Sequence, residues 1–352
     1  MIHEALVRDV AIALKRDLPA LDVEGFVEAC MSDWSDLSLT QRVTAIRKTL
    51  EQSLSGNYLE DRNVIKRLVG RLSKGYSYIF IPEYISENGL DCPEEAMEDL
   101  EVTTPYSSAE FAVRPFIRKY PEFSMQKMLS WTTHDNEHVR RLASEGCRPK
   151  LPWGGVLREF VRDPAPIIPI LKSLKDDRAV YVQKSVANNL NDISKDHPEL
   201  VVELATSWIG QSERTDWILK RGLRTLLKEG HPKALALFGF HSAEKFELKS
   251  LELLHPKLSW GGTQEISYQV LNSGDRSKVR LEYRIHFVKK HGMGSKVFQV
   301  SESEMGKGDL KKGVFRQSFR DLSTRKHYPG GHRLEFIVNG ITKGSLSFEL
   351  LA

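Results

Sequence analysis

The sequence predicts a protein of two parts, an α-helical repeat region followed by an all-β domain. Up to about Phe240 the apolar residues recur at helical spacing, whereas beyond Lys249 short runs alternate apolar with polar residues between Asn-, Ser- and Gly-rich turns. The chain has 352 residues, which is enough for two domains with separate cores. We therefore expect helices over residues 1–240, a linker over 241–248 and a β-sandwich over 249–352.

The composition is that of a globular protein, with 40% hydrophobic and 28% charged residues. The N-terminal stretch MIHEALVRDVAIALKRDLPALD places charged side chains among apolar ones. This pattern is typical of an amphipathic helix and differs from the uninterrupted apolar region of a signal peptide or a membrane span. The three cysteines, Cys30, Cys92 and Cys147, form no CxxC pair. We therefore expect a cytoplasmic protein without a disulfide framework or a structural zinc.

Prolines mark a repeat in the helical part. They begin helix-like runs at intervals of 43, 34 and 34 residues, namely Pro121, Pro164, Pro198 and Pro232. Proline suits the first turn of a helix, where its missing N–H is not needed. The tenth residue after each of the first three prolines is apolar: Trp131, Leu174 and Trp208. A polar turn and a second helical pattern follow each time, and helix pairs with this period are typical of HEAT-like repeats, which stack into a curved solenoid.

The C-terminal part carries the strand patterns EISYQVL, KVRLEYRIHFV, RLEFIVNG and SLSFELL. Asn339-Gly340 lies between the last two, and this pair readily adopts the positive φ angles of a tight hairpin. About seven such strands in roughly 100 residues favour an immunoglobulin-like sandwich. From His241 onward the chain has 19 Lys and Arg against 12 Asp and Glu, whereas residues 1–240 have 32 against 35. A basic C-terminal part indicates an anionic partner.

The second helices of the repeat can be aligned on one another, as HVRRLASEG, YVQKSVANN and WILKRGLRT. On the middle helix an apolar stripe is predicted to face the stack, consisting of Val182, Val186, Leu190 and Ile193. A separate polar line follows at one residue per turn: Lys184, Asn188 and Asp192. The equivalent lines are Arg141 and Glu145 on the preceding helix, and Lys220, Arg224 and Lys228 on the following one. Cations at this spacing suit a phosphate backbone, although a merely solvated face has the same appearance.

The loop SEGCRPKLPWGG between two of these helices has an unusual composition. Trp153 stands between Pro152 and Gly154 and therefore belongs to no helical apolar stripe. Arg148 and Lys150 precede it. A loop Trp beside cations suits a nucleotide, because the ring stacks on a base or sugar while the cations hold phosphates. The alternative is that Trp153 fills a gap between repeats.

Three segments, SSAEFAVRPFI, NEHVRRLASEGCRPKLPWG and VANNLNDISKDHPELV, resemble in order and spacing the AlkC branch of the HEAT-like DNA glycosylases. The upstream FIPEYISENGLDCPEEAMEDLEVTTPYS is similar to that family's lead-in, and the sandwich resembles the immunoglobulin-like domain of one AlkC subgroup. The resemblance implies excision of cationic N-alkylated bases from duplex DNA, notably 3-methyladenine, and leaves open how far 3-methylcytosine and 7-methylguanine are accepted. It also implies a concave DNA-binding face and no metal or organic cofactor, and the sequence itself indicates no obligate protein partner. Such a protein would be associated with the nucleoid when it is bound to DNA.

The expected chemistry requires carboxylates. A 3-methylated purine is already cationic and leaves as a neutral base, so the enzyme has only to stabilise a cationic sugar and to place a water. We expect Asp192 to do this, with Glu145 and Glu110 beside it. The alternatives are an exposed Asp192 at a helix C-terminus, an ordinary surface Glu145, and a Glu110 that forms a capping box with Ser107 and pairs with Arg114.

The remaining expected site residues contact the lesion or the DNA backbone. Trp153 is expected to stack on the lesion. The expected backbone contacts are Arg148, Lys150, Arg114 and Lys184 in the helical part and Lys289 and Lys290 in the sandwich. No lysine is placed as a Schiff-base nucleophile, so lyase activity is not expected. Two other functions stay open: a non-catalytic HEAT scaffold that binds DNA or a protein, and a nuclease that holds Mg²⁺ on clustered carboxylates.

Overall fold

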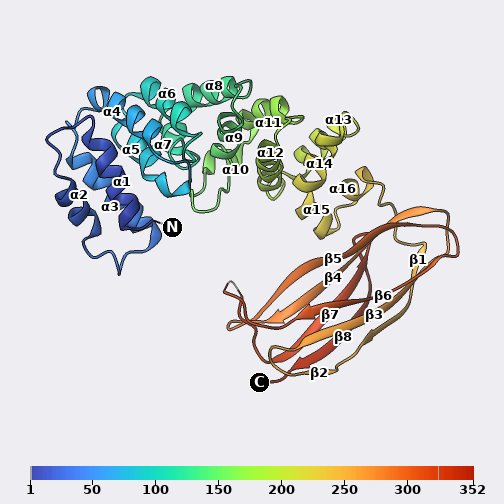
Figure 1. The fold of residues 1–352 in the computed structure, drawn as a ribbon. Helices are drawn as coiled ribbons and strands as arrows, with labels where there is room; N and C mark the ends of the chain where they lie inside the picture. Colours follow the sequence, from blue (N-terminus) through green and yellow to red (C-terminus); the bar gives the residue numbers. More distant parts are fainter. Residues whose placement is uncertain (1, 324) are drawn as a thin grey trace. The chain divides into compact units, whose positions relative to one another are not determined.

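The structure, a computed structural model, describes residues 2–323 and 325–352. Helices occupy the N-terminal part of the chain and strands the C-terminal part, as the sequence predicts (Figure 1). The chain divides into two compact units, one up to Asp196 together with Gly210–Gly222, and the other His197–Ile209 together with Leu223–Ala352. The sequence predicts a single boundary near residue 240. The difference arises because the last helices pack on one another within the second unit.

The first unit is entirely helical. Its helices are α1 (Glu4–Lys15), α2 (Val23–Met31), α3 (Leu39–Gln52), α4 (Tyr58–Arg71), α5 (Phe80–Asn88), α6 (Pro93–Thr103), α7 (Arg114–Lys119), α8 (Pro121–Trp131), α9 (Glu137–Gly146), α10 (Arg158–Arg162), α11 (Ile168–Leu174), α12 (Val180–Ile193) and α14 (Glu213–Gly222). Two short 3₁₀ helices accompany them, η1 (Tyr76–Tyr78) and η2 (Ala165–Ile167). None of the helices in the described ranges has the length and apolar composition needed to cross a membrane.

The predicted repeat is present in the helices. Pro121, Pro198 and Pro232 each occupy the first turn of a helix, whereas Pro164 precedes the 3₁₀ helix η2. The three predicted apolar anchors are buried: Trp131, Leu174 and Trp208. The helices that begin at these prolines and the burial of the three anchors confirm the helical repeat region.

Three second helices, α9, α12 and α14, lie side by side in the first unit. The predicted apolar stripe of α12 is buried between its neighbours. Close packing is visible on both sides of this helix. Ser144 and Ser185 share a hydrogen bond of 2.6 Å between α9 and α12, and a Cβ added to Gly222 would lie 3.0 Å from the Cβ of Leu190. The helix expected to carry Lys220, Arg224 and Lys228 together is instead divided at Leu223 into α14 and α15.

The second unit combines three helices with a β-sandwich. The helices are α13 (Pro198–Trp208), α15 (Arg224–Glu229) and α16 (Pro232–Leu237). The strands are β1 (Phe246–Leu253), β2 (Lys257–Leu258), β3 (Thr263–Asn272), β4 (Ser277–Val288), β5 (Met293–Met305), β6 (Leu310–Ser318), β7 (Gly330–Val338) and β8 (Ile341–Leu350). The described residues thus form eight strands rather than about seven, and β1 begins inside the range that was expected to be linker.

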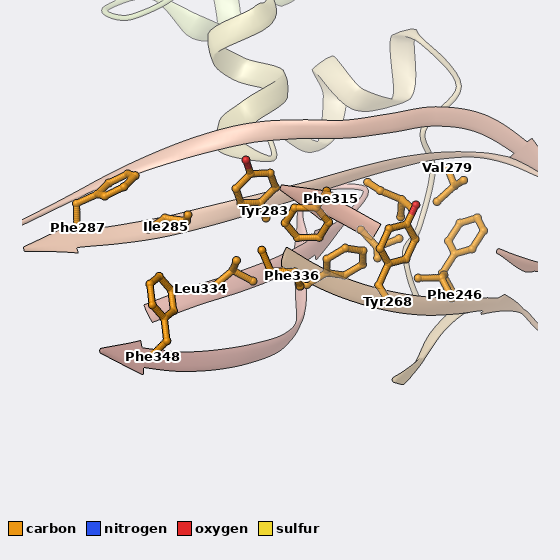
Figure 2. Packing of buried hydrophobic residues seen from close by; sticks show 14 of the residues in the cluster. Phe246, Tyr268, Val279, Tyr283, Ile285, Phe287, Phe315, Leu334, Phe336 and Phe348 are labelled. Atoms are coloured by element: carbon orange, nitrogen blue, oxygen red, sulfur yellow. The ribbon is translucent and has the colours of Figure 1, made fainter. Parts of the chain in front are cut away.

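The strands form two sheets, of order β1-β3-β6 and β2-β8-β7-β4-β5. All pairings are antiparallel except that of the two-residue β2 with β8. Alternate residues of the strands point inward and pack between the sheets, as Figure 2 shows for Tyr268, Tyr283, Phe315 and Phe336. Asn339-Gly340 joins β7 to β8 with positive φ angles of 44° and 81°, which confirms the predicted hairpin.

Candidate functional site

The structure brings the three predicted carboxylates of the first unit into one chain of alternating charges. In order, the contacts are Glu110 to Arg141 at 3.0 Å, Arg141 to Glu145 at 3.5 Å, Glu145 to Arg148 at 2.7 Å, Arg148 to Asp192 at 2.9 Å and Asp192 to Lys195 at 3.1 Å. We refer to these six residues as the ion-pair chain. It joins the segment before α7 to α9, to the loop after α9 and to the end of α12.

Helix packing explains why these residues meet. Arg141 and Glu145 are one turn apart on α9, so their side chains lie on the same face. Asp192 lies in the last turn of α12, which packs against α9. A carboxylate at a helix C-terminus is disfavoured by the helix dipole. Arg148 and Lys195 offset this effect for Asp192 because they contact different carboxylate oxygens.

The carboxylates of the ion-pair chain are buried rather than solvated. Glu110 is 7% exposed, Glu145 is 6% exposed and Asp192 is 2% exposed. The polar line predicted on α12 therefore runs from solvent into the protein, because Lys184 is exposed, Asn188 is half-buried and Asp192 is buried. Buried charges are stable in a protein only when they are paired. The alternatives of an exposed Asp192 and an ordinary surface Glu145 are thus wrong.

The two arginines of the chain hold their protons firmly. Burial alone lowers the pKa of a guanidinium, but the charges of Glu145 and Asp192 outweigh it and raise the pKa of Arg148. Burial of Arg141 is likewise outweighed by Glu110 and Glu145, so the pKa of Arg141 is also raised. Arg148 is buried and bridges two carboxylates, so it contacts no DNA phosphate while both bridges are intact. The sequence placed Arg148 on the DNA backbone because it shows charge but not burial.

Arg114 is the clearest departure from the predicted contacts. Its side chain is 1% exposed and donates hydrogen bonds of 2.8 to 3.0 Å to the carbonyl oxygens of Gly146, Arg148, Gly154 and Gly155. Burial, together with the nearby Arg118 cation, lowers the pKa of Arg114 to about 10. Arg114 thus holds the loop after α9 in place. It is buried away from any DNA backbone and does not pair with Glu110.

The capping box predicted for this segment is also absent. The buried hydroxyl of Ser107 has no hydrogen-bond partner among the described residues. Glu110 turns instead to Arg141, whose guanidinium also donates to Ser108 Oγ at 2.6 Å. Glu110 thus pairs with Arg141, which is distant in the sequence, and not with the nearby Ser107 or Arg114.

The loop held by Arg114 presents Trp153 to solvent. Trp153 is 89% exposed and has a φ of 64°, in the left-handed region that residues other than glycine rarely adopt. Gly154 follows, and a Cβ there would lie 2.9 Å from Leu151 and 3.1 Å from Phe111. Strained backbone of this kind persists where the surrounding structure enforces it, often at a functional site. Trp153 therefore does not fill a gap between helices.

The predicted lysines lie on the surface. Lys150 is half-buried and pairs with Asp196 at 2.6 Å, and Lys184 is exposed. In the second unit, Lys289 and Lys290 are exposed after β4. They line a cavity of about 740 Å³ whose other cationic residues are Lys296, Arg325 and Lys326.

Sequence reasoning missed two tyrosines beside the ion-pair chain. The ring of Tyr181 lies 4.8 Å from the Arg141 guanidinium carbon. The pKa of Tyr76 is raised by burial and by the charge of Glu110. Tyr181 lies three residues before Lys184 on α12, so extending the predicted polar line by one turn would have included it. No local signal marks Tyr76, which comes near Glu110 only through the tertiary fold.

No group of three or more His, Cys, Asp or Glu side chains in residues 2–323 and 325–352 is arranged to hold a metal ion.

Comparisons with known proteins cover both units. Residues 103–223 match the model of the DNA alkylation repair enzyme family, and residues 247–352 match that of the C-terminal Ig-like domain of the uncharacterised protein YhaZ. The chain is 41% identical over 350 residues to the uncharacterized protein YhaZ of Bacillus subtilis (strain 168), a match that covers 99% of this chain and 98% of the relative.

A solved structure is similar over nearly the whole chain. It is the alkylpurine DNA glycosylase AlkC of Pseudomonas fluorescens bound to DNA containing an abasic site analog. The two are 36% identical, the match covers 99% of this chain and 98% of that one, and the TM-score is 0.95. The chain therefore belongs to the DNA alkylation repair enzyme family, in its AlkC-type branch with a C-terminal immunoglobulin-like domain.

Proposed function

We propose that this protein is a monofunctional DNA glycosylase that hydrolyses the N-glycosidic bond of cationic N-alkylated bases in duplex DNA. Its main substrate is 3-methyladenine, with 3-methylcytosine and, more weakly, 7-methylguanine as further substrates. The observation that carries the proposal is the convergence of Glu110, Glu145 and Asp192 in one ion-pair chain, beside a loop that exposes Trp153. The similarity to a glycosylase bound to abasic DNA supports it.

The chemistry of the lesion matches this set of residues. An N-alkylated cationic base carries the positive charge that a general acid would otherwise supply, so it leaves as a neutral molecule. The charge that develops on the sugar is stabilised by fixed anions in a site that excludes water. We assign this role to Asp192, with Glu145 and Glu110 adding to the local negative potential. Asp192 also orients the attacking water and accepts its proton.

The free protein holds these carboxylates paired, so a change of partners on DNA binding is part of the proposal. Lys195 is 40% exposed at its side chain, whereas the side chain of Arg148 is 9% exposed. Lys195 can therefore exchange Asp192 for a DNA phosphate without disturbing the buried Arg148 pair. After such an exchange the negative charge of Asp192 is less neutralised by cations when the sugar becomes cationic.

Trp153 is assigned to the lesion. An indole that faces solvent on a fixed loop offers its ring to a base or sugar without any rearrangement of the core. Cation–π attraction contributes about 0.5 to 2 kcal/mol and favours the cationic lesion over its neutral parent base. We assign the phosphate contacts to Lys150 and Lys184 in the first unit, and to Lys289 and Lys290 in the second.

Two further features belong to the proposal. Because no lysine is assigned as a Schiff-base nucleophile, hydrolysis of the glycosidic bond ends the reaction and the strand is left uncut. Because the substrate is chromosomal DNA, we propose a cytoplasmic protein that associates with the nucleoid.

One assay tests the function against its alternatives. The protein is incubated with methylated duplex DNA in excess EDTA, and the released bases are identified by chromatography. We expect free 3-methyladenine from the wild type and none from Asp192→Asn at unchanged DNA affinity. Release that persists in Asp192→Asn would remove Asp192 from its role. A scaffold would release no base, and a metal-dependent nuclease would cut the strand only without the chelator.

A further inference from the structure

A half-enclosed cavity of about 320 Å³ lies beside the Trp153 loop in the first unit. Its walls come from α3, from η1 and α5, and from the segment that precedes α7. We propose that this cavity binds the methylated purine base after the base has left the sugar. The inference rests on the proposed function, because a glycosylase releases such a base beside this cavity.

The walls suit a flat heteroaromatic ring, with two carboxylates at one side, those of Glu83 and Glu87. Three aromatic side chains line the cavity, Tyr76, Phe111 and Trp153, and aliphatic residues such as Val43 and Ile79 complete it. Offset stacking between aromatic rings contributes beyond the burial of area alone. The volume lies at the lower end of the range typical of small-molecule sites, about 300 to 1,000 Å³. A single base thus fits, whereas a whole nucleotide with its phosphate would face an apolar wall.

One carboxylate in the cavity offers a specific polar contact. Glu83 Oε1 accepts a hydrogen bond from Thr44 at 3.4 Å and lies 3.5 Å from Arg47 Nε. Both distances are long, and both involve the same oxygen. Burial raises the pKa of Glu83, with Arg47 opposing the shift. Because Glu83 has only these two long contacts among the described residues, its oxygens can still accept a hydrogen bond from the exocyclic amino group of a purine.

The cavity begins next to the ion-pair chain. Ser108 lines the cavity and also accepts a hydrogen bond from Arg141 at 2.6 Å. Phe111 lines it as well and follows Glu110 directly in the sequence. Cleavage of the bond changes the base from a cation, which the carboxylates attract, to a neutral ring, which they do not. The neighbouring cavity, which Tyr76, Phe111 and Trp153 line, then offers the neutral ring stacking contacts that the ion-pair chain lacks.

Binding of the free base tests this inference without any DNA. The full-length protein is titrated with free 3-methyladenine in a calorimeter, with free thymine as a smaller comparison ring. We expect saturable binding of one 3-methyladenine per chain and weaker binding of thymine. Tyr76→Ala, Phe111→Ala and Glu83→Gln should each raise the dissociation constant by about tenfold or more. Trp260→Ala removes an aromatic ring in the second unit that is about as exposed as Tyr76. It should leave the dissociation constant for 3-methyladenine unchanged.

The outcomes separate this inference from the proposed function. Base release from methylated DNA with no saturable binding of free 3-methyladenine would overturn the cavity assignment alone. Binding that survives in Tyr76→Ala and Phe111→Ala, with both variants folded by circular dichroism, would overturn it too. Saturable binding that the three variants weaken would support it, even if no base were released from DNA and the proposed function failed.

Discussion

Arg148 donates from Nε to Asp192 Oδ2 at 2.9 Å, and both side chains are almost completely removed from solvent. The same guanidinium donates from Nη1 to Glu145 Oε1 at 2.7 Å. One arginine thus determines the separation of two carboxylates that come from α9 and from the end of α12. Together with Arg141 and Lys195 it balances the charge of the carboxylates in the free protein, so the ion-pair chain is assembled before any DNA arrives.

Loss of Arg148 should destabilise the protein strongly. Arg148→Met leaves Glu145 without its closest cation and Asp192 with Lys195 alone, and breaking a buried pair costs about 3 to 5 kcal/mol. We expect the free energy of unfolding to fall by about this amount in urea denaturation. Arg214→Met is the matched control because its pair with Asp176 is about half exposed, and water and salt screen such a pair so that it contributes little to stability. Equal effects of the two substitutions would contradict the structural importance of the Arg148 pair.

Loss of Arg114 should loosen the loop that carries Trp153. Arg114→Met removes four hydrogen bonds to backbone carbonyls, and the apolar side chain cannot replace them. We expect faster hydrogen–deuterium exchange of the amides from residue 151 to 157, together with slower base release. The control is Arg118→Met, which removes an exposed neighbouring cation. Unchanged exchange in Arg114→Met would show that the loop keeps its shape without the arginine.

Substitutions of Trp153 should separate its effect on base release from its effect on stability. Trp153→Gly relieves the positive φ, so the free energy of unfolding should not decrease. The same substitution removes cation–π attraction of about 0.5 to 2 kcal/mol, which corresponds to a loss of about 2- to 30-fold in single-turnover base release. Trp153→Ala should lose the same activity and retain the strain. If Trp153→Gly released bases at the wild-type rate, the indole would have no role in recognition.

The sequence predicted the elements of this molecule better than their contacts. Helical periodicity and the proline repeat identified the helix pairs, because the residues that fill the interior must recur at the helical period. Asn339-Gly340 identified the β7–β8 hairpin, because few other residue pairs adopt its backbone angles. Such signals are local, so one sequence is enough to read them.

The site could be predicted only in part. Glu110, Glu145 and Asp192 were named from motif resemblance and polar spacing, but their bridging by arginines depends on how α9 and α12 pack. Arg148, in the loop before Trp153, and Arg114, in the upstream segment SSAEFAVRPFI, are both predicted from the sequence to contact the DNA backbone. Charge is visible in a sequence, whereas burial is not, and burial is what makes these two arginines structural.

The sandwich should lose stability in mildly acidic solution because of His332. The ring is buried and stacks on Phe348 at 5.5 Å. Nδ1 accepts from the backbone N–H of Val288 at 3.4 Å, and Nε2 lies 3.2 Å from the carbonyl oxygen of Tyr328, which fits the neutral tautomer with its proton on Nε2. Burial lowers the pKa of His332 below the value of 6.5 that applies to an exposed histidine.

The direction of the pH effect follows from this lowered pKa. Below pH 6.5 the unfolded chain binds a proton that the folded sandwich excludes, so stability decreases until the pH reaches the lower folded-state value. We expect the unfolding midpoint in urea, followed by circular dichroism of the full chain, to fall between pH 7 and about 5. His332→Phe should reduce this fall because phenylalanine cannot titrate, whereas His291→Ala, at an exposed position, should leave it unchanged. A pH dependence identical in wild type and His332→Phe would assign the effect to other groups, among them the neighbouring buried His327, whose pKa is lowered by burial as well.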